Sequence, residues 1–352
     1  MTRFRLLLVN EFKFFRTAIP IHMVALLQPT ILYLLMSAIL VHPTFDMYVD
    51  RPESEAGWAL VAAMEKVGSP IGEPYINPII IDWDGGEVAR QVVAVEQRDG
   101  RQTAVQYYGL IDSNLVKNFR NRLTAAGLRL WNEELGSEAV GVEEQPWLPR
   151  DVPYTVYFGM ALLSMTAFLS ASIVGAYLTA QEFESETITE YQLAPVPAAS
   201  ILAARLARLV ILALISATIL LLAVGLLTGY WPASPWLVGL ILLPVAIIAG
   251  SLGVLAGLLM RKLIPAFLVG LVASFVGWIL GSAFGLAAGF GGWYERISRL
   301  TPFTHATELL FGQYYGASIG RPLVSVLFLL CLSAAMLLLM TIAYRWRVLR
   351  QG

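Results

Sequence analysis

Six stretches of the chain are long enough and apolar enough to cross a lipid bilayer, and none of them contains a charged side chain. A membrane-spanning helix needs about 20 predominantly apolar residues. Each stretch is near or above that length, so the sequence predicts an α-helical polytopic membrane protein with six transmembrane helices. The stretches are residues 19–41, 154–180, 209–228, 236–260, 263–288 and 322–344.

The composition agrees with this class. Hydrophobic residues make up 57% of the chain and charged residues 14%, whereas soluble domains carry about 25% charged residues. The formal net charge of −1 argues against a nucleic-acid partner. Charged side chains inside membrane spans usually mark ion pathways and proton relays. Their absence from these six stretches predicts that the driving energy comes from outside the membrane helices.

Lysine and arginine predict the orientation. Loops rich in these residues stay in the cytoplasm, and they gather in the N-terminal segment, in the loop after the fourth stretch and in the C-terminal tail. Both termini are therefore expected in the cytoplasm, with residues 345–352 as a cytoplasmic tail. Residues 1–18 place apolar side chains on one side and basic ones on the other, which is typical of a helix lying in the membrane interface.

Residues 42–153 form the one long segment between the first two spans, and we expect them to lie outside the cell. Residues 79–81 and 91–96 read as strands, and residues 103–108 read as the returning strand of a hairpin. Residues 113–135 show the apolar spacing of a helix. The sequence thus predicts a mixed α/β extracytoplasmic domain between transmembrane helices 1 and 2.

Residues 154–344 carry transmembrane helices 2–6 and contain one segment of intermediate polarity. Residues 290–320 are too polar to span the membrane and too apolar to leave it. We expect short helices that re-enter the outer leaflet and are broken at Pro302 and Gly312, since irregular backbone at this depth must be buried in protein or line a cavity.

Glycines repeat every four residues in the fifth stretch, at positions 277, 281, 285 and 289. Such spacing lets two helix backbones approach closely. The partner helix is either another helix of the same chain or a helix of a second copy.

The loop of residues 181–204 is the most specific feature. It holds four glutamates, Glu182, Glu184, Glu186 and Glu190, beside a membrane face that is expected to be cytoplasmic. Anionic lipid repels such a segment, so it more plausibly faces a protein. A short helix-like run follows, with a stop at Pro195.

Here the sequence resembles the permeases of ABC-2-type exporters. In that family the loop after the second span typically carries acidic residues, Gly-Thr, a glutamate, a leucine and a proline. This chain has Glu186-Thr187, Glu190, Leu193 and Pro195 in matching order, with Glu186 where the family has glycine. Asn10-Glu11-Phe12-Lys13, Gln28-Pro29 and Leu300-Thr301-Pro302-Phe303-Thr304 support the resemblance. The long segment between the first two spans, residues 42–153, is similar to the large extracytoplasmic domain found in one subgroup of the family.

The resemblance implies a permease in a bacterial or archaeal cell (inner) membrane that works as a homodimer or pseudo-dimer with two copies of a cytoplasmic ATP-binding subunit. Residues 1–18 would form an elbow helix beside the coupling loop. The ATPase-coupling residues would be Glu182, Glu184, Glu186, Thr187, Glu190, Leu193 and Pro195.

No motif for chemistry of its own is present. The chain has no G-x-x-x-x-G-K-[ST] sequence for ATP, and its three histidines lack zinc-site spacing. We therefore expect no enzymatic activity, cofactor or metal. A pathway is expected between spans two and five and beneath residues 290–320, with Ser170, Ser274, Gly281 and Glu308 as candidate lining residues. The alternative is that residues 290–320 only cap the bundle.

Two functions from different classes remain at this point. The first is the permease of an ATP-driven exporter, whose uncharged interior favours a hydrophobic or amphiphilic substrate. The second is an ATP-independent facilitator or a membrane anchor that displays a sensing or scaffolding outer domain. An ATPase that copurifies with the chain would favour the first.

Overall fold

The computed structural model describes residues 7–9, 11–12, 18–40, 45–68, 74–85, 92–98, 101–107, 113–135, 152–193, 196–281, 283, 285, 292–318 and 320–349. The chain divides into two compact units, one formed by Met1–Ser37 with Pro146–Gly352 and the other by Ala38–Gln145. Each unit is described by itself.

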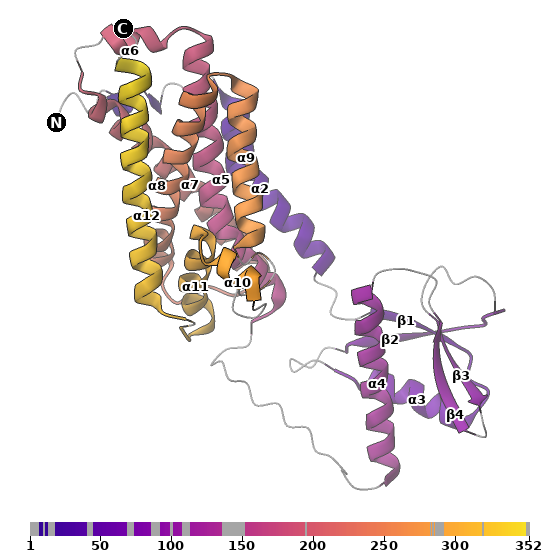
Figure 1. Ribbon diagram of the computed structural model, residues 1–352. Helices are drawn as coiled ribbons and strands as arrows, with labels where there is room; N and C mark the ends of the chain where they lie inside the picture. The colour runs from indigo at the N-terminus through magenta and orange to yellow at the C-terminus, as the bar shows by residue number, and fades with distance from the viewer. Residues whose placement is uncertain are drawn as a thin grey trace. The chain divides into compact units, whose positions relative to one another are not determined.

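The first unit is a helical bundle (Figure 1). Six of its helices are long and apolar enough to cross a membrane, which confirms the predicted fold class. The end of the bundle that carries α6 lies opposite the end that carries α10 and α11. In chain order the elements are α2 (Ile19–Leu40), α5 (Tyr154–Glu184), α6 (Ile188–Leu193), α7 (Ala198–Thr228), α8 (Pro235–Met260), α9 (Leu263–Leu280), α10 (Gly292–Ser298), α11 (Pro302–Tyr315), α12 (Pro322–Tyr344) and the π-helical turn η2 (Arg345–Leu349).

Helix α5 is the core of the bundle, packed against α7, α8, α9 and α11. Its most apolar 18-residue window is wholly buried. Small residues let its neighbours come close: a Cβ added to Gly253 of α8 would lie 2.2 Å from the carbonyl oxygen of Ser172 in α5. The most apolar windows of α2, α9 and α12 are only 22–33% buried. Their exposed apolar side chains suit contact with lipid, whose acyl chains are as apolar as leucine.

Several helix ends differ from the apolar stretches of the sequence. Helix α5 continues to Glu184 and α7 begins at Ala198, so both helices contain charged residues at one end of the bundle. Helix α9 ends at Leu280 instead of continuing to residue 288, and Gly281 is its C-cap. The glycine repeat therefore does not lie along one helix, and position 289 is outside the described residues.

The predicted break at Gly312 is wrong, because α11 runs through this residue and ends at Tyr315, before Gly316. The start at Pro302 is confirmed, since Pro302 occupies the first turn and the Thr301 side chain caps it. Of the predicted interfacial helix 1–18, residues 7–9 and 11–12 are helical. Apart from Ala18, its other residues lie outside the described ones.

The second unit is a four-stranded sheet with two helices. Its elements are β1 (Phe45–Asp50), α3 (Glu55–Glu65), β2 (Ile76–Ile81), β3 (Val92–Arg98), β4 (Arg101–Tyr107) and α4 (Ser113–Leu135). The strand order is β2-β1-β3-β4. Strand β1 is parallel to β2 and to β3, with Val49 beside Val93, while β4 pairs antiparallel with β3. The predicted hairpin and the helix 113–135 are present, and β1 and α3 are additional.

The core of this unit follows from the alternation in β1. Met47 and Val49 are buried while Tyr48 and Asp50 are half-buried, because successive side chains of a strand point to opposite faces. On the buried face, residues of α3 and Ala126 of α4 complete one apolar cluster. The Ser54 side chain accepts a hydrogen bond from the Gly57 backbone N–H at 3.1 Å and so fixes where α3 begins.

Candidate coupling site

A buried cluster of four charged residues joins three parts of the helical bundle. Glu11 comes from the N-terminal segment, Glu182 from the end of α5, and Arg205 and Arg208 from the first turns of α7. Glu11, Arg205 and Arg208 are 6%, 2% and 3% exposed. The spacing of three between the arginines places both on one face of α7.

The contacts within the cluster are specific. Oε2 of Glu11 lies 3.0 Å from Nη1 of Arg208, and Oε1 lies 3.9 Å from Nε of Arg205. Nη1 of Arg208 also donates to the backbone carbonyl of Glu11 at 2.8 Å. Arg205 donates to a carboxylate oxygen of Glu182 and, at 3.3 Å, to the hydroxyl of Thr179. Two negative and two positive side chains thus neutralise one another where an isolated charge would be costly.

The cluster borders a small pocket of about 210 Å³. Within the described residues, Oε2 of Glu182 has no hydrogen-bond partner although it is buried. The lining residues are all polar or charged except one: Glu11, Leu178, Gln181, Glu182, Ser185, Thr187 and Arg208. A pocket of this size and polarity can hold water that satisfies the remaining carboxylate oxygen.

The turn between α5 and α6 is held in an unusual backbone conformation. Glu186 has a φ of 59°, in the left-handed region that glycine adopts most easily. A side chain at this position therefore carries a steric cost that glycine would avoid. The hydroxyls of Ser185 and Thr187 lie 3.1 Å apart across the turn.

This turn is braced by the turn between α8 and α9. Oε1 of Glu184 accepts a hydrogen bond from the backbone N–H of Leu263 at 2.9 Å, at the N-terminus of α9, where a carboxylate is favoured. The guanidinium carbon of Arg261 lies 5.2 Å from the centre of the Phe183 ring. The α5–α6 turn therefore cannot shift without disturbing a second turn at the same end of the bundle.

The predicted coupling residues divide into two groups. Glu182 is in α5, largely buried against Arg205, and Glu184 caps α9. Glu186, Thr187 and Glu190 are exposed and are available to a partner. Leu193 is the last residue of α6, but its side chain is not among those that the structure describes. Pro195 lies outside the described residues.

Sequence reasoning did not identify Glu11, Arg205 and Arg208 as site residues. The available signal is the spacing of three residues between Arg205 and Arg208, just before the apolar stretch 209–228, together with the acidic Glu182 just after the stretch 154–180.

Three of the candidate pathway residues lie at contacts between helices. Ser170 donates to the carbonyl oxygen of Ala25 in α2 at 2.6 Å. Ser274 of α9 donates to Gly270 at 2.6 Å and lies 3.0 Å from the hydroxyl of Ser172 in α5. A Cβ added to Gly281 would lie 2.4 Å from Cβ of Phe303 in α11. Gly281 and Gly277 thus pack against α11 of the same chain, which answers the question left open by the glycine repeat.

Glu308 lies in a separate buried network at the other end of the bundle. Its Oε2 accepts a hydrogen bond from Ser325 of α12 at 2.9 Å, and the Ser325 hydroxyl lies 3.0 Å from Nδ1 of His305. Nε2 of His305 lies 2.9 Å from the carbonyl oxygen of Arg299. These contacts tie α11 to α12 beside a pocket of about 520 Å³. Nη1 of Arg299 lies 3.7 Å from Oε1 of Glu308, and Arg299 also pairs with Glu295 at 2.8 Å, so the charge of Glu308 is balanced at this rim.

Comparison with known protein families gives a match that covers most of the chain. The profile of the family described as ABC-2 family transporter protein matches residues 97–344. This range contains α5, the α5–α6 turn, Arg205 and Arg208, and all the later membrane helices. No curated protein matches the chain.

Proposed function

Because the chain belongs to the ABC-2 family of transporters, we propose that it is the permease subunit of an ATP-driven exporter that moves a hydrophobic or amphiphilic substrate outward. A permease of this family associates with an ATP-binding subunit. ATP hydrolysis is assigned to that subunit, and the permease supplies the membrane path.

The buried cluster of Glu11, Glu182, Arg205 and Arg208 is the observation that carries the coupling role. It fixes the N-terminal segment, the end of α5 and the beginning of α7 to one another, and it lies directly before the exposed turn and α6. A displacement of α6 by the ATP-binding subunit is therefore transmitted through these ion pairs to α5, the central helix, and to α7. Rigid elements joined by short polar contacts are the physical means by which one site biases another.

The docking surface in this proposal consists of Glu186, Thr187 and Glu190. Their side chains are exposed and two of them are acidic, so an ATP-binding subunit that docks here presents a basic surface. Complementary charge across an interface favours the correct partner. Two copies of that subunit and a second permease are proposed from the family alone, since Gly277 and Gly281 pack against Phe303 of the same chain.

The orientation in this proposal places α6 and both termini in the cytoplasm and the unit Ala38–Gln145 outside, in a bacterial or archaeal cell membrane. Outward transport then starts at the end of the bundle that carries α6. The pathway role of Ser170, Ser274, Gly281 and Glu308 stays a prediction. Bulky residues at Ser170 or Gly281 would disturb helix packing as well as any path.

Copurification with the ATP-binding subunit tests the proposal. The surface variant Glu186→Lys/Glu190→Lys reverses two exposed charges without touching the buried cluster. It should abolish copurification at moderate salt, because like charges across an interface cost several kcal/mol. The matched control Glu65→Lys reverses an exposed charge on α3 and should copurify normally.

The outcome decides between the two classes of function. If no ATPase copurifies with the wild-type chain under any condition, the exporter proposal is wrong. The alternative, an ATP-independent facilitator or a membrane anchor for the outer domain, then replaces it. If the ATPase copurifies equally with wild type and the surface variant, α6 is not the docking surface.

A further inference from the structure

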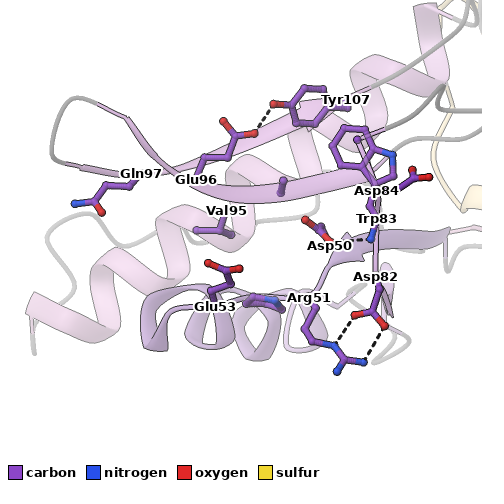
Figure 2. A pocket seen from close by; sticks show the side chains of 13 residues that line it. Asp50, Arg51, Glu53, Asp82, Trp83, Asp84, Val95, Glu96, Gln97 and Tyr107 are labelled. Carbon is purple, nitrogen blue, oxygen red and sulfur yellow. Dashed lines mark hydrogen bonds and ion pairs between the residues drawn. The ribbon is translucent and has the colours of Figure 1, made fainter.

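A cleft of about 1050 Å³ opens in the unit Ala38–Gln145 at the carboxyl ends of its parallel strands (Figure 2). Strand β1 lies between β2 on one side and β3 on the other. The chain leaves β1 towards α3 and β2, and later returns to pair on the opposite edge of β1. In open sheets with parallel strands, ligands bind outside the carboxyl ends of the strands at such a reversal of strand order.

Three segments form the walls of this cleft. The first follows β1 and includes Asp50 and Glu53, and the second follows β2 and includes Trp83 and Asp84. The third wall is the β3–β4 hairpin. Strand β3 reaches the cleft because it continues past the end of β1, and Val93 is its last residue that pairs with β1. The cleft is therefore a product of strand register and order, and not a gap between surface side chains.

One wall is aromatic. The rings of Trp83 and Tyr107 pack with centroids 4.7 Å apart and planes inclined by 51°. The backbone N–H of Trp83 donates to Oδ1 of Asp50 at 3.0 Å, which fixes the Trp83 backbone against the end of β1. Figure 2 shows both rings beside Asp84, on the same side of the cleft.

The charges of the cleft are strongly unequal. Among the described residues, its lining contains five carboxylates, of Asp50, Glu53, Asp82, Asp84 and Glu96, and one arginine, Arg51. Arg51 pairs with Asp82 at 2.9 Å between Nε and Oδ1. Arg98, outside the lining, pairs with Glu96 at 2.8 Å. Within the described residues, no cation is paired with Glu53.

This combination selects one class of ligand. An anion would be repelled by the excess of carboxylates in the lining. A metal ion needs several close ligands, and the described residues contain no group of three or more His, Cys, Asp or Glu placed to hold one. An organic cation differs from a metal ion, because it needs diffuse negative charge and an aromatic face rather than converging oxygens.

We propose that this cleft is a binding site for an organic cation with an apolar body, such as an amine or quaternary ammonium compound. The cationic group lies against Asp50 and Glu53, and the apolar body lies on the ring of Trp83. The volume of the cleft is that of a site for a drug-sized molecule. The proposal does not depend on transport, since it concerns a unit with its own sheet and core.

Binding of benzyltrimethylammonium to the full chain in lipid nanodiscs tests the site. Calorimetric titration should give saturable binding that weakens as salt is added, because salt screens partly exposed charges. Benzenesulfonate has a similar ring and the opposite charge and should not bind. Empty nanodiscs provide the baseline for partition into lipid.

Matched variants locate the binding. Glu53→Gln removes one charge from the cleft and should weaken binding by about fivefold or more. Glu65→Gln removes an exposed charge from α3, outside the cleft, and should leave the affinity unchanged. Trp83→Phe keeps the backbone hydrogen bond to Asp50 and should weaken binding by about threefold, because the smaller ring offers less aromatic surface to the apolar body of the ligand.

Two results would overturn the proposal. One is equal affinity of wild type and Glu53→Gln, and the other is binding of benzenesulfonate as tight as that of the cation. The melting temperature of each variant shows whether the unit is still folded. Failure of the ATPase to copurify would leave these measurements unaffected, so the two proposals fail separately.

Discussion

Arg205 of α7 donates a hydrogen bond to the carboxylate of Glu182 in α5, and the two side chains are only 2% and 13% exposed. This contact lies two residues before the end of α5 and four before the strained residue Glu186. The last turn of the most buried helix is therefore coupled to the first turns of its neighbour. Glu11 extends the same coupling to the N-terminal segment through Arg208.

Replacing Glu182 tests how much this ion pair stabilises the bundle. Glu182→Ala leaves Arg205 without its closest carboxylate, and removal of one partner from a buried pair costs about 3–5 kcal/mol. Glu182→Gln keeps an oxygen that can accept from Arg205 and should cost less. Denaturant unfolding in detergent should therefore rank the free energy of unfolding as wild type, then Glu182→Gln, then Glu182→Ala. The exposed-site control Glu190→Gln should match wild type, and equal stability of all four proteins would contradict the role of the pair.

Glu186 gives a prediction of the opposite sign. Its φ of 59° places Cβ near the following carbonyl oxygen, at a cost of roughly 1–2 kcal/mol for a residue other than glycine. Glu186→Gly should therefore raise the free energy of unfolding by about 1 kcal/mol. Glu190→Gly, within α6, should lower it by a similar amount because glycine is a poor helix former. If the two variants changed stability in the same direction, the left-handed turn would not be the cause.

The membrane helices could be predicted from sequence because length and hydropathy decide which segments enter a bilayer. Their ends could not, because hydropathy does not distinguish an apolar helix from apolar irregular backbone. Residues 263–288 are continuously apolar, yet α9 ends at Leu280, where Gly277 packs against the ring of Phe303 and Gly281 against its Cβ. In the other direction, α7 begins before its apolar stretch because Arg205 and Arg208 find buried partners.

The sheet unit shows a similar limit. Strand β3, strand β4 and helix α4 follow from alternation, a turn and helical spacing. Strand β1 alternates as well, with Met47 and Val49 on its buried face, but six residues that include the charged Asp46 and Asp50 are easily missed. The order β2-β1-β3-β4, which creates the cleft, depends on long-range pairing of β1 with β2 and β3, and no local pattern encodes it.

Helix α8 contains two glycines that should respond differently to the same change. A Cβ at Gly253 would lie 2.2 Å from the Ser172 carbonyl oxygen, whereas a Cβ at Gly239 would meet nothing within 4 Å. Gly253→Ala forces α8 away from α5 and should cost about 1–3 kcal/mol, as overpacking does. Gly239→Ala should cause no loss and can gain up to about 1 kcal/mol. Fluorescence size-exclusion after heating measures both, and equal melting temperatures would show that α5 and α8 do not pack this closely.

The β3–β4 hairpin should weaken in acid. Tyr107 and Arg98 donate hydrogen bonds to Glu96 and lower the pKa of this carboxyl below its ordinary value of 4.5, with the bond from Tyr107 as the largest cause. A carboxyl with a lowered pKa in the folded state stabilises that state above its unfolded pKa, and the stabilisation is lost as the pH falls through the folded pKa. The protection factors of the hairpin amides, which correct exchange for its intrinsic pH dependence, should therefore fall below about pH 4.5 in wild type. Glu96→Gln should show no such fall, and a variant that retained it would assign the effect to another carboxyl.

Cysteine labelling tests which side of the membrane each unit occupies. Cys331 is exposed on α12, so the Cys331→Ser background removes the only natural thiol of the chain. Glu65 of α3 and Glu190 of α6 are both exposed, and each can be replaced by cysteine without loss of a described contact. If both termini and α6 are cytoplasmic, a membrane-impermeant maleimide added to intact cells should label Glu65→Cys at once. It should label Glu190→Cys only after the membrane is permeabilised. The reverse pattern would invert the orientation and with it the direction of transport, and it would also move the ATPase-docking surface away from α6.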